Sequence, residues 1–460
     1  MPDAWEYPWF ASWDLAFHCV AMAHLDPTEA KRQLLLLLRE WYTHPNGQIP
    51  AYEWEFSDAN PPVHAWAAVR VFQVDGSRDH DFLARVFHKL LLNFSWWVNR
   101  KDAEGNNLFE GGFLGLDNIG PFNRSEPLPV PGVLEQSDGS GWMAMYCLNL
   151  LEMALILLEH DPSYEEITLK FAEHFAYIAG AMTGLWDDDD ALFYDVIRRP
   201  DGDVVPVKVR SMVCVVPVFA LTVVREHQIA RMPDTAARLQ WFADHHPFAA
   251  DVGRLTRGPG GRELLLSVVP PERLARVLAK VLDPDEFLSD HGLRSLSKWH
   301  GDHPAVIDVD GAQAQVDYEP AESRTGLFGG NSNWRGPVWF PVNELIIEAL
   351  VRYHSFLGDD FRVELPTGSG RSATLGEVAE DLVARLVSLF TRGPDGRRAV
   401  FGDIELLQSD EAWQDLIWFH EYFDGDTGAG LGASHQTGWT ALVGHLIALR
   451  RWRSDLQGDA

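Results

Sequence analysis

The sequence is poor in cysteine and in positive charge. Its 460 residues include only three cysteines, Cys19, Cys147 and Cys214, and none has the spacing of a disulfide framework or a zinc site. We therefore expect reduced, buried thiols. Lys and Arg number 38 against 67 Asp and Glu, which gives a formal charge of -29. Because this charge repels phosphate backbones and anionic membranes, it excludes nucleic acid as a partner.

Long apolar runs and targeting signals are also missing. The run Leu34–Leu38 is followed at once by charged residues, and Leu148–Leu158 contains Glu152, so we expect no membrane span. No basic segment followed by an apolar one opens the chain, which predicts a cytoplasmic protein. The phosphate-binding loop, the nucleophile elbow and the His-Glu-x-x-His motif are absent, and we expect neither a cofactor nor a metal.

What the sequence does contain is helical periodicity. Apolar residues recur at spacings of three and four, as in Phe82, Val86, Leu90, Phe94 and Trp97, and this pattern is typical of amphipathic helices. The periodicity predicts eleven helices, near residues 13–25, 28–43, 62–74, 79–100, 140–159, 163–182, 209–227, 234–247, 341–357, 375–392 and 435–453.

Strand signals are few. Residues 191–197 and 204–209 alternate around Pro200-Asp201-Gly202 and predict a hairpin, and 264–269 is a further short candidate. We predict an all-α fold, an (α/α)6 barrel of two concentric helical rings with a small β-hairpin and long loops over its mouth. Residues 1–460 would form one catalytic domain, with 250–340 as a long loop excursion within it. Twelve helices are needed, so the first is expected upstream of Met1.

The densest group of polar and aromatic residues lies in a glycine-rich loop between two predicted helices. It runs from Phe419-His420-Glu421-Tyr422 to Gly430-Leu431-Gly432. Loops on rigid scaffolds are where catalytic groups concentrate, and Glu421 is the acidic candidate there. Composition alone also fits a surface glutamate at a helix end.

Three motifs together resemble glycoside hydrolase family 63: Tyr7-Pro8-Trp9-Phe10-Ala11-Ser12-Trp13-Asp14, the stretch 326–339 ending in Asn333-Trp334-Arg335-Gly336-Pro337-Val338-Trp339, and the Glu421 loop. They stand in the family's order across nearly the whole chain. The resemblance implies an (α/α)6 barrel that cleaves α-glycosidic bonds with inversion. Many members carry an N-terminal β domain, to which nothing in this sequence corresponds.

Inversion requires an acid and a base on opposite faces of the sugar. The resemblance places the base at Glu421. For the acid we predict Asp117, because Leu114, Leu116 and Ile119 around it disfavour the charged form and raise its pKa. An Asx-turn residue is the structural alternative. Competing carboxylates are Glu110, Glu135, Asp138 and Asp14.

Sugar rings stack on aromatic side chains, and their hydroxyls bind polar ones. The resemblance places Trp13 and Asp14 against the sugar, although an aspartate at that position also fits a helix N-cap. The full predicted substrate-binding set is Tyr7, Trp9, Trp13, Asp14, Gln136, Trp334, Arg335, Trp339, Tyr422, His435 and Gln436. The predicted partner is a small oligosaccharide or glycoside. The acidic run Asp187–Asp190 is interpreted as a solvated loop rather than a calcium site.

Two other functions remain open from the sequence. A sugar epimerase or isomerase on the same barrel would use paired histidines, for which His18, His64, His300 and His435 are candidates. A non-catalytic carbohydrate-binding protein would keep only the aromatic cleft. A glycerate-linked substrate would require a basic pocket, with candidates Arg294, Arg324 and Arg335.

Overall fold

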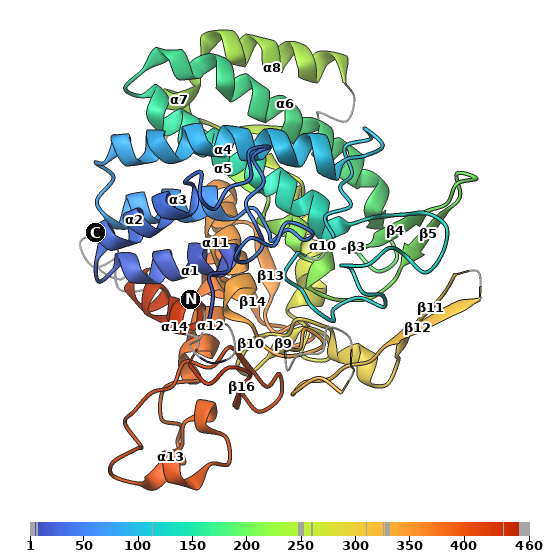
Figure 1. Cartoon of the computed structure of the whole chain (residues 1–460), viewed down its shortest axis with the longest axis vertical. Helices are drawn as coiled ribbons and strands as arrows, with labels where there is room; N and C mark the ends of the chain where they lie inside the picture. Colours follow the sequence, from blue (N-terminus) through green and yellow to red (C-terminus); the bar gives the residue numbers. More distant parts are fainter. Residues whose placement is uncertain are drawn as a thin grey trace.

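The computed structural model describes residues 5, 8–112, 114–246, 253–258, 261–309, 311–324, 326, 332–435 and 437–449. Helices carry most of the regular structure, and they stack in layers through the upper part of the molecule (Figure 1). Their bounds are α1 (Ser12–Ala23), α2 (Pro27–Leu37), α3 (His64–Val74), α4 (His80–Lys101), α5 (Ser137–Leu158), α6 (Glu165–Met182), α7 (Glu226–Ile229), α8 (Pro233–His245), α10 (Pro271–Val281), α11 (Phe340–Leu357), α12 (Leu375–Ser388), α13 (Glu405–Ser409) and α14 (Thr437–Thr440).

The strands are short and form small antiparallel sheets. Two sheets have three strands, in the orders β1-β4-β5 and β6-β8-β7, and the others are hairpins of two. The bounds are β1 (Val133–Glu135), β2 (Trp186–Asp187), β3 (Leu192–Phe193), β4 (Asp195–Arg198), β5 (Val204–Val207), β6 (Leu221–Arg225), β7 (Gly253–Gly258), β8 (Gly261–Ser267), β9 (Leu288–Ser289), β10 (Gly292–Leu293), β11 (Ala305–Val309), β12 (Ala312–Val316), β13 (Arg362–Glu364), β14 (Ser372–Thr374), β15 (Tyr422–Phe423) and β16 (Gly430–Leu431). The predicted hairpin is β4–β5, with Asp195 paired to Val207.

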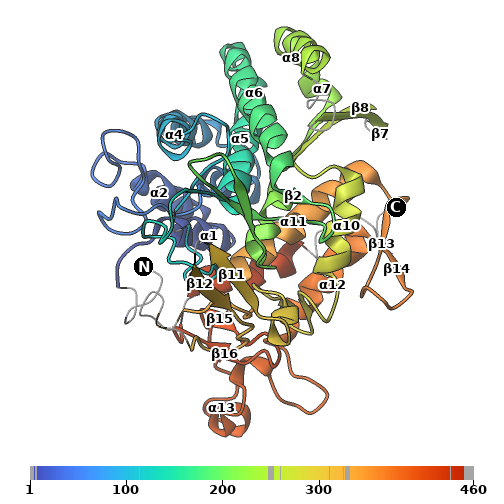
Figure 2. The ribbon, with the colours of Figure 1, turned by 90° about the vertical axis from the view of Figure 1, so that its right-hand side faces the viewer.

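The inner elements follow one another in a closed circuit of contacts. Helix α1 contacts α3, α3 contacts α5, α5 contacts the 3-10 segment η4 (Val216–Phe219), η4 contacts α11, α11 contacts α14, and α14 returns to α1. Outside them, α2, α4, α6 and α12 pack on α1, α3, α5 and α11. Figure 2 shows α1 and α11 near the middle, with α2 and α12 on opposite sides.

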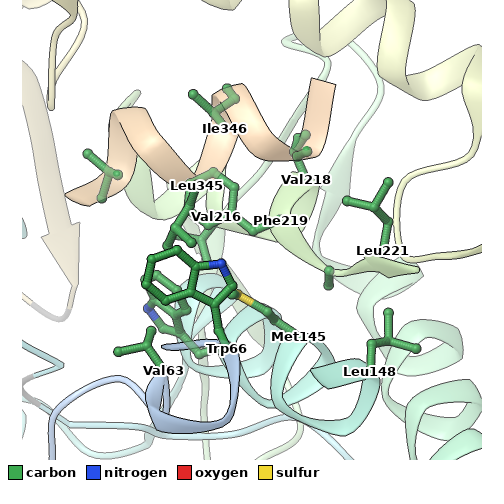
Figure 3. Close-up of a cluster of buried hydrophobic side chains, with 14 of the residues drawn as sticks. Val63, Trp66, Met145, Leu148, Val216, Val218, Phe219, Leu221, Leu345 and Ile346 are labelled. Atoms are coloured by element: carbon green, nitrogen blue, oxygen red, sulfur yellow. The ribbon is translucent and has the colours of Figure 1, made fainter. Parts of the chain in front are cut away.

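The core fills the space inside this circuit. Figure 3 shows Trp66 of α3 beside Met145 of α5 and Leu345 of α11, with Leu148 of α5 and Phe219 of η4 in the same cluster. All five side chains are at most 4% exposed. Burial of apolar area at this density is the main stabilising term in folding, and here it joins elements that are far apart in the sequence.

Helix α5 corrects the prediction that no segment has the length and apolarity of a membrane span. By length and composition alone it is, within the described ranges, one helix that qualifies, because Glu152, the acidic residue in its apolar C-terminal part, does not break its apolar character. The most apolar window of α5 is 89% buried inside the fold. The helix contacts α3, α4, α6 and η4, as a core helix does.

The predicted helix 209–227 is wrong. Residues 212–225 instead form short 3-10 turns and strand β6, which pairs with β8. Pro217 cannot donate a helical hydrogen bond, and the many valines of this stretch favour extended backbone. The last predicted helix, 435–453, is interrupted after α14, and helical structure resumes to Leu449.

Residues 250–340, predicted as a loop excursion, contain regular structure in their described part. Helix α10 buries Leu274, Val277, Leu278 and Val281, an apolar face that the sequence prediction missed. Strands β7 to β12 also lie in this stretch. The β11–β12 hairpin projects away from the helices (Figure 1).

Candidate active site

Asp117 lies in the loop between α4 and α5 and is half-buried. Leu114, Leu116 and Ile119 around it are fully buried. Burial raises the pKa of the Asp117 carboxyl to about 6, and a hydrogen bond with the Ser332 hydroxyl opposes part of that shift. Because a carboxyl with this pKa holds its proton at weakly acidic pH, it is suited to proton donation.

The side chain of Asn118, next to Asp117, ties this loop to the segment 333–335. Its Nδ2 donates to Asn333 Oδ1 at 3.0 Å, and its Oδ1 accepts from the Trp334 backbone N–H at 2.7 Å. Arg335 Nε donates to the Asn118 carbonyl at 2.7 Å. Buried polar groups need such partners, and here the partners join two loops that are more than 200 residues apart.

An aromatic stack continues from this segment to the Glu421 loop. Trp334 and Trp339 are parallel, with ring centroids 4.0 Å apart, and Trp339 stacks in turn on Tyr422 at 4.6 Å. Trp439 meets the edge of Trp339 at 5.5 Å and that of Trp13 at 5.5 Å. Stacked and edge-to-face ring pairs stabilise a fold beyond the effect of the apolar area they bury. These rings therefore fix the Glu421 loop relative to the Asp117 loop.

Glu421 is held by its own loop and is only 4% exposed. Its backbone N–H donates to the Ala433 carbonyl at 3.0 Å, and its Oε2 accepts from the Ala433 N–H at 3.1 Å. Trp439 Nε1 donates to the Glu421 carbonyl at 3.0 Å. Gly432 leaves room for the carboxylate, since a Cβ there would lie 2.6 Å from Oε2. Glu421 is therefore not a surface glutamate at a helix end.

Helix α1 brings Trp13 and Asp14 to the same region. The Trp13 ring lies 6.1 Å from Trp334, and Gly115 packs against it so closely that a Cβ would lie 2.7 Å from the indole. Asp14 is 6% exposed and sits in the first turn of α1, whose N-cap is Ala11. The N-cap alternative for Asp14 is therefore wrong.

Several predicted sugar contacts have structural partners instead. Trp339 is fully buried with Trp334 on one face and Tyr422 on the other, so it supports the site rather than presenting a face to a sugar. Gln136 uses its amide on the backbone of Gly112, accepting from N–H at 2.6 Å and donating to the carbonyl at 3.1 Å.

Two further predicted binding residues, Trp9 and His435, have aromatic neighbours. Trp9 is half-buried, with its ring 6.2 Å from Tyr52. His435 is exposed, with its ring 6.2 Å from Phe419. Tyr7 and Gln436 lie outside the described residues.

Two of the competing carboxylates are salt-bridged. Asp138 is fully buried and accepts from Arg124 through both oxygens, at 2.6 and 2.7 Å. Glu135 accepts from Arg198 through both oxygens at 2.8 Å. Glu110 is half-buried, and burial raises its pKa. Because their oxygens are already engaged by guanidinium groups, Asp138 and Glu135 are less suited than Asp117 to reach a substrate.

Two of the three arginine candidates for a basic pocket already have hydrogen-bond partners within the protein. Arg335 donates to the carbonyls of Asn118 and Gly120, and Arg294 donates to Asp426 at 3.0 Å and to the Tyr318 hydroxyl at 2.9 Å. Arg324 is exposed. These contacts hold loops together.

Three of the four histidines considered for an isomerase have structural contacts, and the acidic run is paired with cations. His64 Nε2 contacts the Leu34 carbonyl at 3.0 Å, and His300 Nε2 accepts from the Arg210 backbone N–H at 2.9 Å. His18 packs against Gly438 of α14. In the run Asp187–Asp190, three carboxylates pair with Lys208, Arg210 and Arg276. No group of three or more metal-binding side chains was found within the described ranges.

A cavity of about 690 Å³ lies elsewhere, between the ends of α1 and α3 and the helices α11 and α12. Its lining includes His24, Arg70, Glu344, Glu348 and His445. Neither Asp117 nor Glu421 contributes to it.

The residues that the sequence prediction missed are Asn118, Ser332 and Gly432. The Asp-Asn pair in a glycine-rich loop was a signal for Asn118, whereas Ser332 and Gly432 become visible only through their contacts.

The helical scaffold thus carries one carboxyl in each of two linked loops, with tryptophans between them, and this arrangement is suited to binding a sugar. Residues 7–113 and 263–440 match the family described as mannosylglycerate hydrolase MGH1-like glycoside hydrolase domain. The chain belongs to this family, which is part of glycoside hydrolase family 63. Glu421 lies inside the matched residues, and Asp117 lies just beyond residue 113.

Curated relatives agree with this family. The chain is 51% identical to an uncharacterized protein of Saccharomyces cerevisiae, over 99% of this chain and 44% of that protein. It is 22% identical to the mannosyl-oligosaccharide glucosidase of the same yeast, over 72% of this chain and 28% of that protein. The chain therefore spans less than half the length of these relatives.

Solved structures share the fold. A mannosylglycerate hydrolase of family 63 from Thermus thermophilus, in complex with glucose, matches with a TM-score of 0.58 and 16% identity, over 97% of this chain and 95% of that one. The neutral trehalase Nth1 of Saccharomyces cerevisiae matches with a TM-score of 0.57 and 13% identity, over 96% and 72%.

Proposed function

We propose that this protein hydrolyses an α-glycosidic bond with inversion, using Asp117 as general acid and Glu421 as general base. The observation that carries the proposal is the contrast between the two carboxyl groups. Asp117 has a pKa raised to about 6, which suits a donor, whereas Glu421 accepts a backbone hydrogen bond at 3.1 Å, which favours the carboxylate of a base.

The scaffold we infer for this chemistry is an (α/α)6 barrel. The closed circuit α1, α3, α5, η4, α11 and α14 corresponds to its inner ring, and α2, α4, α6 and α12 to part of its outer ring. The Asp117 loop precedes α5, Trp13 and Asp14 lie in the first turn of α1, and the Glu421 loop precedes α14. In such a barrel, the loops that precede the inner helices lie at one end, so the Asp117 loop, the start of α1 and the Glu421 loop would surround one site.

In the reaction, the Asp117 carboxyl gives its proton to the glycosidic oxygen as the bond to the anomeric carbon breaks. Glu421 takes a proton from the water that attacks the opposite face, so that the product has the inverted configuration. This geometry requires carboxyl groups roughly 6.5–9.5 Å apart. Asp14 is the second candidate for the acid.

We infer a small α-glucoside or α-mannoside as substrate. The family description and a relative's name support this class, since they mention a mannosylglycerate hydrolase and a mannosyl-oligosaccharide glucosidase. Two of the three arginines considered for a glycerate carboxylate, Arg335 and Arg294, are engaged with loop backbone and with Asp426, whereas Arg324 is exposed. We therefore expect neutral glycosides to be hydrolysed at least as well as glycerate-linked ones.

The test is proton NMR of the first sugar anomer released from a panel of α-linked glucosides, mannosides and their glycerate derivatives. We expect the β anomer to appear first, and we expect Glu421→Gln to lower kcat about 1,000-fold or more. The exposed variant Glu411→Gln serves as the control.

Release of the α anomer would disprove inversion. Unchanged hydrolysis by Glu421→Gln would disprove the base, and unchanged hydrolysis by Asp117→Asn would transfer the acid role to Asp14. Sugar epimerisation that survives Glu421→Gln would favour an isomerase, and binding without turnover by the native protein would favour a lectin-like role.

A further inference from the structure

We propose that Asn118 is a positioning residue for the Asp117 carboxyl, acting as a clamp between the Asp117 loop and residues 332–335. The inference rests on the proposed acid role of Asp117 and adds the residue that holds it in place. Asn118 touches no reacting atom in this scheme, so its effect on catalysis passes through Asp117.

The buried Asn118 side chain has three hydrogen-bond partners. Asn118 is 1% exposed, and its Nδ2 donates to Asn333 Oδ1 at 3.0 Å and to Ser323 Oγ at 3.1 Å. Its Oδ1 accepts from the Trp334 N–H at 2.7 Å. A buried amide with both donor and acceptor used holds its neighbours in one arrangement.

The backbone of the Asp117 loop is also hydrogen-bonded to the segment 332–335. Arg335, itself 2% exposed, donates from Nε to the Asn118 carbonyl at 2.7 Å and from Nη2 to the Gly120 carbonyl at 3.0 Å. Charge-assisted hydrogen bonds of a planar guanidinium fix direction as well as distance. The backbone of residues 118–120, which follows Asp117, is therefore fixed to Arg335.

On the opposite loop, the contacts of Asn118 lie next to a residue that binds Asp117 itself. Asn333 accepts the Asn118 amide and also receives the Arg335 backbone N–H at 2.9 Å. The residue before Asn333 is Ser332, whose hydroxyl is hydrogen-bonded to the Asp117 carboxyl. Asp117 is consequently held from two sides: its chain neighbour Asn118 is bonded to residues 333–334, and Ser332 of the opposite loop is bonded to its carboxyl. Both attachments depend on the contact between the Asp117 loop and residues 332–335.

The experiment compares Asn118→Ala and Asn118→Asp with Asn93→Ala. Asn93 is a matched control, because it is 4% exposed and its amide likewise both donates and accepts: it donates to the Gly47 carbonyl at 2.9 Å and accepts from the Tyr146 hydroxyl at 2.9 Å. The readouts are kcat, KM and the pH dependence of kcat/KM, together with the melting temperature. Ser323→Ala removes one partner and gives a milder variant that keeps the clamp.

We expect Asn118→Ala to lower kcat about 100-fold with a small change in KM, since a loosened acid is misplaced at the reacting bond. Exposure of Asp117 to water would lower its pKa, so the basic limb of the kcat/KM profile should move to lower pH. Asn118→Asp keeps the acceptor for Trp334 but adds a negative charge beside Asp117, so that the limb moves up. Asn93→Ala lowers the melting temperature and leaves the limb in place.

If both Asn118 variants lower only the melting temperature, as Asn93→Ala does, Asn118 is purely structural and the inference fails. If Asn118→Ala does not fold, Asn118→Asp decides, because it keeps the contact with the Trp334 N–H and loses the amide donors to Asn333 and Ser323: a lowered kcat supports the inference, and an unchanged kcat overturns it. An inactive Asp117→Asn next to unperturbed Asn118 variants overturns the clamp alone, whereas a fully active Asp117→Asn overturns the acid assignment itself.

Discussion

The rings of Trp339 and Tyr422 stack with centroids 4.6 Å apart and 24° between their planes. One residue precedes helix α11, and the other directly follows the proposed base. Trp339 also donates from Nε1 to the Asn333 carbonyl at 2.9 Å, so it joins the Glu421 loop to the segment that contacts the Asp117 loop. Trp339 therefore stands between the two halves of the site.

Trp339→Ala should lower both stability and turnover. Removing a fully buried tryptophan costs about 3–5 kcal/mol, and the loss of the stack frees the Glu421 loop, so kcat should fall more than KM rises. The control is Trp299→Ala, which removes a tryptophan that is 41% exposed and stacked on His303. Equal loss of turnover in both variants, measured beside urea unfolding, would contradict a specific role for Trp339.

Gly432→Ala should displace the Glu421 carboxylate. A Cβ at this position would lie 2.6 Å from Glu421 Oε2 and 2.6 Å from the Tyr422 ring, and its φ of +69° adds backbone strain. We expect kcat to fall about 10- to 100-fold. Gly396→Ala is the matched control, because its φ is +79° with open space around it. It should cost about 1 kcal/mol of stability and leave kcat unchanged.

The pKa of Asp117 predicts how activity depends on pH. A proton donor must be protonated, and its pKa is about 6, so kcat/KM should fall as the pH rises above about 6. Ser332→Ala removes the hydrogen bond that lowers this pKa and should move the limb to higher pH. A limb that stays in place in the Ser332 variant would show that another group controls it.

The same shift predicts a gain in stability for Asp117→Asn. The folded-state pKa is raised above the ordinary 3.8, so the native state binds more protons than the unfolded state between about pH 4 and 6. Stability is therefore lost as the pH rises through this window. Above pH 6, Asp117→Asn should be about 1–3 kcal/mol more stable than the native protein and no more stable at pH 4. Exposed Asp302→Asn is the control for chemical denaturation at both pH values.

The buried pair Arg124–Asp138 should be costly to break. Its side chains are 3% and 0% exposed, and Arg124→Met leaves Asp138 without its cation. We expect a loss of about 3–5 kcal/mol at pH 8. The loss should be smaller at pH 5, because Asp195, whose pKa is raised to about 7 by burial and by Asp138, then takes up a proton.

The contrast for that pair is Arg32→Met, whose partner Glu29 lies with it on the surface of α2. An exposed pair contributes about 1 kcal/mol or less. If the Arg124 variant lost no more than this in thermal unfolding, the buried pair would not stabilise the Asp117 side of the site.

The helices were largely predictable, because their apolar periodicity is local. The buried face of α4 (Phe82, Val86, Leu90, Phe94 and Trp97) was visible from spacing alone. Residues 212–225 were not, since their apolar pattern fits a buried strand as well as a helix and the pairing with distant β8 decides between them. Helix α10 was hidden among proline-, glycine- and aspartate-rich neighbours.

Motifs and short-range periodicity were enough to identify the family, the helical class, and Glu421 and Asp117 as candidates, because these follow from residue types and their local spacing. The folded arrangement was needed to show that Trp339 and Gln136 support loops, that Asp14 is no N-cap, and that Asn118 joins the Asp117 loop to residues 332–335. The partners of Asn118 lie more than 200 positions away along the chain, and no local pattern encodes which of those residues will meet.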